Sequence, residues 1–128
     1  MRLLLDTHYV LAAAEGGVNP RFPEVRSILD AVPGHHVYSV ASLWEIAIKV
    51  RLGKLHAALP LPSIAPFLDA SGLHLLGIEV AHVLHTLDPE PPTRDPFDRL
   101  LLAQCHVEGL RLVTVDRALI DHPLAFRP

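Results

Sequence analysis

Two apolar segments that lead directly into an aspartate constrain the fold of this chain more than any other feature. Residues 3–5 read LLL and precede Asp6, and residues 110–115 read LRLVTV and precede Asp116. Short apolar runs without strict alternation are typical of strands that are buried on both faces, as in a parallel sheet covered by helices. The sequence therefore predicts two interior strands, each with a carboxylate where the strand ends.

The rest of the chain alternates between helical and strand-like patterns. Tight hairpin signals are lacking between the strands, which favours parallel crossovers. We therefore expect an α/β fold with a central parallel sheet flanked by helices on both faces. The expected helices are residues 7–17, 20–34, 42–55, 63–72, 79–87 and 96–109, and the further strands are residues 35–40 and 73–78.

The length and composition fit one compact domain spanning residues 1–128. Half of the 128 residues are hydrophobic, enough for a substantial core without disulfides. The proline-rich segment 88–95 is too short for a domain linker and is expected to be a loop. The single cysteine, Cys105, has no intrachain partner and is predicted to be a buried core residue, which fits a reducing compartment.

The N-terminal residues indicate the cellular compartment, and the net charge indicates which ligands the surface could bind. Asp6 interrupts the first apolar run too early for a signal peptide, and no apolar run is long enough for a membrane span, so a cytoplasmic protein is expected. A net charge of -3 argues weakly against a broad polyanion-binding surface. It does not exclude a nuclease, because a metal ion can bring positive charge to an acidic pocket.

Asp6 and Asp116 lie where ligands bind in an open parallel sheet, beyond the carboxyl ends of the strands. They would share one edge if their strands were neighbours. Taken alone, either aspartate is better explained as the cap of the following helix.

Glu45 has both a structural and a functional interpretation. Ser42 and Glu45 fit a capping box, and Glu45 and Lys49 fit an ion pair one helical turn apart. The neighbours of Glu45 are nearly all apolar, so its helix is expected to pack on more than one side. A carboxylate there would point into a pocket.

The segment 94–104, RDPFDRLLLAQ, contains two aspartates with different expected roles. Asp95 precedes Pro96, a favoured first helical residue, and therefore fits the N-cap position. Asp98 shares a helical stripe with Leu101, Leu102 and Cys105, an unfavourable place for an idle charge. We therefore expect Asp95 to cap the helix and Asp98 to act in the site.

Four carboxylates could thus meet at one edge of the sheet. Brought together without a counterion they would repel one another, so such a cluster implies a bound cation or a raised pKa. Oxygen-only ligation favours Mg²⁺ or Mn²⁺ over zinc. The four candidates are Asp6, Glu45, Asp98 and Asp116.

Three segments resemble successive motifs of the PilT N-terminal (PIN) domain family, in particular the ribonuclease toxins of VapBC toxin-antitoxin systems. They read LLLDTHYVLAA, SVASLWEIAIKVRLGKL and RDPFDRLLLAQCHVEGLRLVTVD, and the resemblance runs from about Leu3 to Leu119. It implies that the four acids are metal ligands and catalytic residues in Mg²⁺- or Mn²⁺-dependent cleavage of RNA. It also implies a cognate antitoxin partner and a homodimer, for which residues 22–32 and 42–50 offer apolar helices.

Other residues are assigned supporting roles. Thr7 and Ser42 are expected to be helix-cap hydroxyls, and Thr114 a residue that orders Asp116 by a hydrogen bond. Lys49, Arg51 and Lys54 could contact RNA phosphates or simply form a solvated helix end. The family commonly has an arginine directly before its last acid, where this chain has Val115, which leaves the role of Asp116 less secure.

Three other interpretations fit the sequence less well. Nine histidines, including His35-His36 and His82-x-x-His85, suggest zinc, but adjacent strand residues face opposite ways and no CxxC or HExxH motif is present. A phosphatase or receiver-like domain also carries acids at strand ends, but His8 stands where a haloacid-dehalogenase pattern requires a second aspartate. A non-catalytic binding module is the third alternative.

Overall fold

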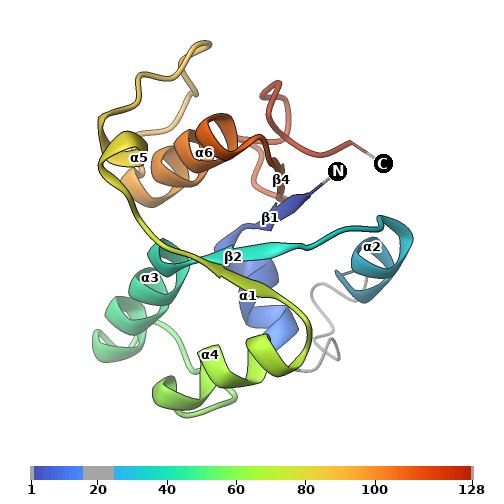
Figure 1. Ribbon diagram of the computed structural model, residues 1–128. Coiled ribbons are helices and arrows are strands. Elements are labelled where there is room, and N and C mark those ends of the chain that lie inside the picture. Colours follow the sequence, from blue (N-terminus) through green and yellow to red (C-terminus); the bar gives the residue numbers. More distant parts are fainter. Residues whose placement is uncertain (1, 16–24, 128) are drawn as a thin grey trace.

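The computed structural model describes residues 2–15 and 25–127 and contains a four-stranded, fully parallel sheet between two helical layers (Figure 1). The predicted α/β class and the predicted alternation of strands and helices are confirmed. The strands are β1 (Leu3–Leu5), β2 (Val37–Ser39), β3 (His74–Leu76) and β4 (Arg111–Val113). The helices are α1 (Thr7–Ala14), α2 (Val25–Ala31), α3 (Val40–Arg51), α4 (Leu61–Ala70), α5 (Val80–Leu84) and α6 (Pro96–Glu108).

The sheet separates two apolar cores. In β1, Leu3 and Leu5 face the core formed with α1 and α4, whereas Leu4 faces the core beneath α6. This explains the uninterrupted apolar run, because both faces of the strand are covered. Cys105 lies fully buried in the α6 core, as predicted, and burial raises the pKa of its thiol.

The strand order β3-β2-β1-β4 makes β1 and β4 neighbours. Leu5 is in register with Val113, and the Asp6 N–H donates to the Val113 carbonyl at 3.0 Å. The two strands that lead into aspartates therefore end side by side at the same edge of the sheet.

Helix α3 begins earlier than the sequence pattern indicated. Strand β2 passes into the helix without a loop, and Ser39 is the N-cap, with its hydroxyl accepting the Ala41 N–H at 3.0 Å. The predicted capping box of Ser42 and Glu45 is therefore wrong, because Ser42 lies within the first turn and Glu45 within the second. The earlier start places Glu45 in the second turn of the helix rather than the first.

The remaining differences concern element ends. Helix α5 ends at Leu84, before the expected boundary at residue 87, and α4 begins at Leu61. Gly16 and Gly17, expected to end the first helix, and the expected start of the second lie outside the described residues. Gly109 ends α6 in the left-handed conformation, with φ of 69°, as expected for a helix-terminating glycine.

The C-terminal segment adds an interaction that the sequence pattern did not indicate. The Leu112 N–H donates to the Leu124 carbonyl at 2.8 Å, and the Phe126 N–H donates to the Leu112 carbonyl at 2.7 Å. This segment thereby covers the edge of the sheet at β4. Within the described part of the chain, no helix is long and apolar enough to cross a membrane.

Candidate metal centre

Asp6 lies at the junction of β1 and α1, and one oxygen of its carboxylate caps the helix. It is the N-cap of α1, and its Oδ1 accepts the Tyr9 N–H at 3.0 Å. The side chain is almost fully buried, and Oδ2 lies 3.7 Å from His8 Nδ1. The hydrogen bond with Asp6 raises the pKa of His8. Oδ1 of Asp6 therefore serves the cap, while Oδ2 faces His8.

Glu45 is held between α1 and α3 by a short polar network. The Thr7 hydroxyl lies 2.6 Å from Glu45 Oε1 and 3.0 Å from Ser42 Oγ. On its other oxygen, Glu45 pairs with Lys49 Nζ at 2.9 Å, so the predicted helical ion pair is confirmed. Thr7 thus acts on Glu45, and Ser42 pairs with Thr7, rather than either residue serving as the helix cap expected from the sequence. The buried carboxylate is fixed by one hydroxyl and one cation.

Asp95 caps α6 as the sequence suggested, and Asp98 does not take part in the cap. Asp95 is the N-cap, and its Oδ1 accepts the N–H groups of Phe97 at 2.8 Å and Asp98 at 3.3 Å. Asp98 occupies the third helical position and is half-buried. The side chain of Asp98 therefore stands beside the cap without forming part of it.

Asp116 lies three residues beyond β4, at the start of a tight turn. Its Oδ1 accepts the Ala118 N–H at 2.8 Å. The Thr114 hydroxyl accepts the Asp116 backbone N–H at 3.1 Å, so Thr114 orders the backbone of Asp116 rather than its carboxylate. Val115 is 41% exposed and presents an apolar side chain to solvent between them.

The pKa of Asp98 is affected by the charges of the other acids. The pKa of Asp98 is raised from 3.8 to about 7, chiefly by burial and in addition by neighbouring negative charges. Acids that lie far apart in the sequence therefore act on one carboxyl group through space. In decreasing order of effect, the charges are those of Asp95, Asp116, Glu45 and Asp6.

The donor set fits a hard divalent cation in its chemistry but is not arranged as a closed set of ligands. Every candidate donor is a carboxylate oxygen, the type that Mg²⁺ and Mn²⁺ prefer. Asp6 and Asp116 each use Oδ1 for a backbone N–H, and the second oxygen of Asp6 faces His8, so an ion bound there would share that oxygen with His8. In residues 2–15 and 25–127, however, no group of three or more histidines, cysteines or acids is close enough together to hold a metal ion.

The basic residues of α3 differ in their availability. Lys49 is engaged with Glu45, and that hydrogen bond raises the pKa of Lys49. Arg51 and Lys54 are exposed at the end of the same helix, and neither forms an ion pair with any described residue. These two side chains are therefore free to meet an anion.

Three of the histidines that suggested zinc have structural partners, whereas Nε2 of the fourth, His85, is buried without a hydrogen-bond partner. His36 is buried, accepts the Leu3 N–H on Nδ1 at 3.2 Å, and places Nε2 2.6 Å from the Val32 carbonyl. His35 faces the other way and lies 3.2 Å from His74. His82 accepts the Glu79 N–H and places Nε2 2.9 Å from Glu108.

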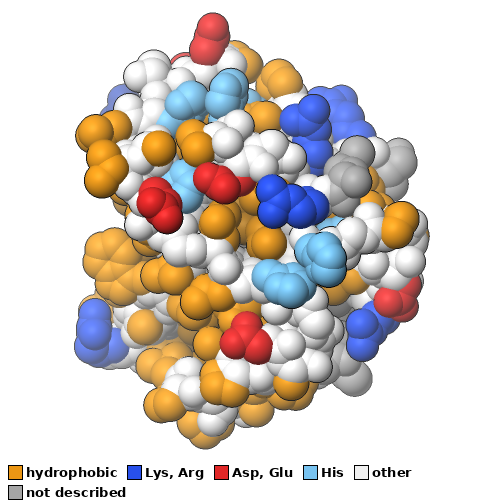
Figure 2. All heavy atoms as spheres, viewed as in Figure 1, with side chains coloured by type: hydrophobic (Ala, Val, Ile, Leu, Met, Phe, Trp, Pro, Cys, Tyr) orange, Lys and Arg blue, Asp and Glu red, His pale blue; other side chains and the backbone are white. Residues whose placement is uncertain are grey.

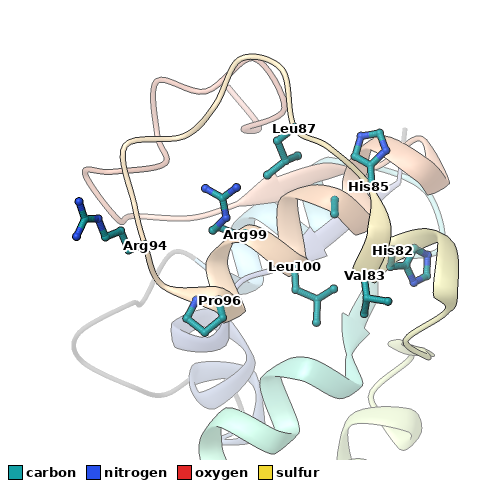
Figure 3. Close-up of a pocket in the computed structure, with 9 residues that line it drawn as sticks. His82, Val83, His85, Leu87, Arg94, Pro96, Arg99 and Leu100 are labelled. Atoms are coloured by element: carbon teal, nitrogen blue, oxygen red, sulfur yellow. The ribbon is translucent and has the colours of Figure 1, made fainter.

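A pocket of about 520 Å³ lies between α5, the following loop and α6 (Figure 3). Arg94 and His85 lie at opposite ends of it, and Arg99 on α6 extends toward the loop, where it pairs with Glu90. None of the four candidate acids lines this pocket. The acidic edge of the sheet therefore remains the better candidate for chemistry.

Two neighbours of the acids were missed by sequence reasoning. From the sequence, a backbone-bonded His8 was favoured over one that approaches the acids, yet in the structure His8 lies beside Asp6. Trp44 and Phe97 form an edge-to-face ring pair with centroids 5.5 Å apart, which joins α3 to α6 next to Glu45 and Asp98. The position of each aromatic residue directly beside a candidate acid was visible in the sequence, but their contact was not.

Comparison with known proteins gives one family match and several similar folds. The PIN domain family profile matches residues 3–123. A toxin-antitoxin complex from Klebsiella pneumoniae is similar with a TM-score of 0.68 and 16% identity, over 98% of this chain and 96% of that chain. No curated protein sequence matches this chain.

Two further solved structures share the fold at similar identity. Mycobacterium tuberculosis VapC20, described as a Sarcin-Ricin loop cleaving toxin, is similar with a TM-score of 0.64 and 15% identity, over 98% of this chain and 99% of that chain. Rickettsia felis VapBC2, bound to a DNA fragment from its promoter, has a TM-score of 0.61 and 15% identity, over 98% of this chain and 96% of that chain. These likenesses support the three-layer fold over nearly the whole length.

Proposed function

The chain belongs to the PIN domain family, and from this membership we propose that it is a metal-dependent ribonuclease. In this proposal Mg²⁺ or Mn²⁺ is held by the four acids, and the reaction is hydrolysis of RNA phosphodiester bonds. The observation that carries the proposal is the raised pKa of Asp98, to which charges from four separate acids contribute. The proposed catalytic and metal-binding residues are Asp6, Glu45, Asp98 and Asp116.

In this proposal the residues around the four acids hold the carboxylates in position for a metal ion. A divalent ion, when bound, supplies an activated water and charge stabilisation for the leaving oxygen. Thr7 keeps Glu45 oriented toward α1, and Lys49 offsets its charge. The N–H donors at Asp6 and Asp116 fix one oxygen of each carboxylate, so that its rotation is restricted.

The substrate is proposed to approach along α3. Arg51 and Lys54 are exposed beyond the acidic edge and suit contacts to RNA phosphates. Lys49 would contribute less, because its ammonium is paired with Glu45. Asp95 is proposed to support the site by capping α6 and by its charge on Asp98.

We further propose that the protein is a VapC-type toxin with a cognate antitoxin in the cytoplasm. The similar folds of a toxin-antitoxin complex and of two VapC or VapBC proteins support this assignment. An arginine or lysine of the antitoxin would suit the acidic edge of the sheet as a charge partner.

The protein is also proposed to form a homodimer. Residues 42–50 and 22–32 were the expected pairing segments, and the first three residues of the second lie outside the described residues. Helix α5 offers a further surface, since Val80, Val83 and Leu84 are 71%, 56% and 75% exposed. Figure 2 shows hydrophobic side chains at the left edge of the molecule, over α5 and over part of α3.

Cleavage of total RNA with Mg²⁺, with Mn²⁺ and with EDTA tests the proposed activity. We expect cleavage with either metal, none with EDTA, and none by a folded Asp98→Asn variant. Asp121→Asn is the matched control, because it removes the same charge at an exposed position and should retain activity. A folded wild-type protein that leaves RNA intact with both metals would contradict the proposal.

Cell growth tests the toxin assignment separately. Expression of the protein alone should stop growth, and co-expression with the neighbouring small reading frame should restore it. Normal growth in the presence of soluble, folded protein would contradict this assignment without contradicting ribonuclease activity. A monomer mass in light scattering at micromolar concentration would contradict the dimer.

A further inference from the structure

Lys49 is the only lysine or arginine that forms an ion pair with one of the four candidate acids in residues 2–15 and 25–127. Its Nζ lies 2.9 Å from Oε2 of Glu45, while Oε1 of Glu45 accepts the Thr7 hydroxyl at 2.6 Å. Both oxygens of Glu45 are therefore engaged. Since Glu45 is only 7% exposed, the ammonium meets an inner carboxylate of its own chain, whatever covers the outer side of α3.

The ammonium of Lys49 interacts with acids on two helices. The pKa of Lys49 is raised, chiefly by the hydrogen bond with Glu45 and also by the charges of Glu45, Asp95 and Asp98. Helix α3 packs against α6, which begins at Asp95 and carries Asp98. Lys49 thus places a positive charge where these carboxylates would otherwise repel one another.

The two partners of Glu45 differ in how easily they can leave it. A divalent cation on Oε2 would lie next to the ammonium, and the two positive charges would repel each other. The hydroxyl on Oε1 belongs to Thr7, which is buried and has a short side chain. Lys49 reaches Oε2 through a flexible four-carbon stem, so its ammonium can withdraw without a change in the backbone. Lys49 is therefore the partner that a metal ion would displace.

We propose that Lys49 is a tethered counterion of the metal centre, and that its ammonium must leave Oε2 before Glu45 can bind a divalent ion. The inference rests on the proposed function and adds a competition that sets the metal affinity of the site. It also accounts for acids that interact through space without forming a closed set of ligands in the described part of the chain. Lys49 is then a positioning residue that acts through Glu45.

Removal of the ammonium should strengthen metal binding. Lys49→Met keeps a side chain of similar length without the charge and should bind Mn²⁺ about 10-fold more tightly, the lower end of the range for a hydrogen bond between charged groups, because Lys49 is half-exposed. Lys49→Arg keeps the charge and should show no such gain. The electron paramagnetic resonance signal of free Mn²⁺ measures this affinity without RNA. Lys54→Met is the matched control, since Lys54 is exposed and forms no ion pair with a described residue.

Thermal unfolding should show effects of opposite sign without and with the metal. In EDTA, Lys49→Met should melt below wild type, because the buried Glu45 carboxylate loses its cation. Saturating Mn²⁺ should then raise the Tm of Lys49→Met by more than it raises the Tm of wild type.

The wild-type chain offers a direct measurement, because Lys49 and Lys54 are its only two lysines. The chain is labelled with carbon-13 at the lysine ε-carbons, and Lys54→Met assigns the two signals. Saturating Mg²⁺, which is diamagnetic, should shift the Lys49 signal and leave the Lys54 signal in place. This measurement needs no substitution at Lys49, so it tests the inference even where Lys49→Met fails to fold.

Several results would overturn the inference and leave the proposed function intact. They are equal Mn²⁺ affinity of wild type and folded Lys49→Met, weaker binding by Lys49→Met, and a Lys49 signal that saturating Mg²⁺ leaves in place. An equal gain in Lys54→Met would assign the effect to net charge instead of the contact with Glu45. Absence of Mn²⁺ binding and of wild-type RNA cleavage would remove both the inference and the proposed function.

Discussion

Replacing Asp98 by asparagine should stabilise the metal-free protein, and the gain should depend on pH. In the folded chain the pKa of Asp98 is about 7, against an ordinary value of 3.8. Because the folded value is raised, the folded state binds the proton more tightly, and stability falls as pH rises between these two values. Above pH 7 the full penalty is present, and below about pH 4 it is absent.

The size of this penalty follows from the pKa difference and from exposure. A rise from 3.8 to about 7 corresponds at most to about 4 kcal/mol in the free energy of unfolding. Since Asp98 is only half-buried, solvent screening reduces this to about 1–2 kcal/mol. For a domain of this size the expected rise in Tm is on the order of 3–8 °C.

Thermal unfolding in EDTA at pH 8 and at pH 4 measures the effect. Asp98→Asn should melt above wild type at pH 8 and together with it at pH 4. Asp121→Asn serves as the control, because it removes an exposed charge outside the acidic cluster and should show no such difference. Equal melting of Asp98→Asn and wild type at pH 8, or a gain that is independent of pH, would refute the proposed charge crowding.

Three other substitutions test the supporting contacts. Asp95→Ala removes the cap of α6 and should cost about 0.5–2 kcal/mol of stability in denaturant melts, whereas Asp95→Asn should cost much less; equal losses would show that the cap is not the cause. Thr7→Val leaves the buried Glu45 Oε1 without its hydroxyl donor and should cost about 1–3 kcal/mol by chemical unfolding, while Thr7→Ser should be near wild type; similar stability of both variants would contradict the role of the hydroxyl. Glu45→Gln should abolish the rise in Tm that Mg²⁺ gives to wild type, as measured by titration in a thermal shift assay, and an unchanged Mg²⁺ response would exclude Glu45 as a ligand.

The sequence predicted the parts of the site that depend on local pattern. Asp6 and Asp116 were found because apolar strands end at them, and Asp95 because proline marks the first turn of a helix. Their common edge depends on the strand order, which the sequence left open because many parallel orders suit the same alternation of elements. The structure pairs β1 with β4, which brings the two strand ends together.

The structural features that the sequence did not predict depend on contacts between distant segments or on the absence of a loop between β2 and α3. Ser39 caps α3 because β2 passes directly into the helix, whereas a sequence pattern gives equal weight to Ser42. The pairing of Leu124 with Leu112 involves too few residues to produce a strand pattern. The contact of Trp44 with Phe97 joins residues more than fifty positions apart and could not be read from either helix alone.

Two acids lie at helix N-termini, and this placement affects the electrostatics of the metal-free chain. Asp6 and Asp95 cap α1 and α6, whose axes therefore both start at the acidic edge of the sheet. The aligned peptide dipoles of a helix place the equivalent of roughly half a positive charge at its start. Two such helices supply about one positive charge at the place where the carboxylates repel one another. The backbone itself thus acts as a built-in partial counterion, which offsets part of the repulsion among these carboxylates in the metal-free chain.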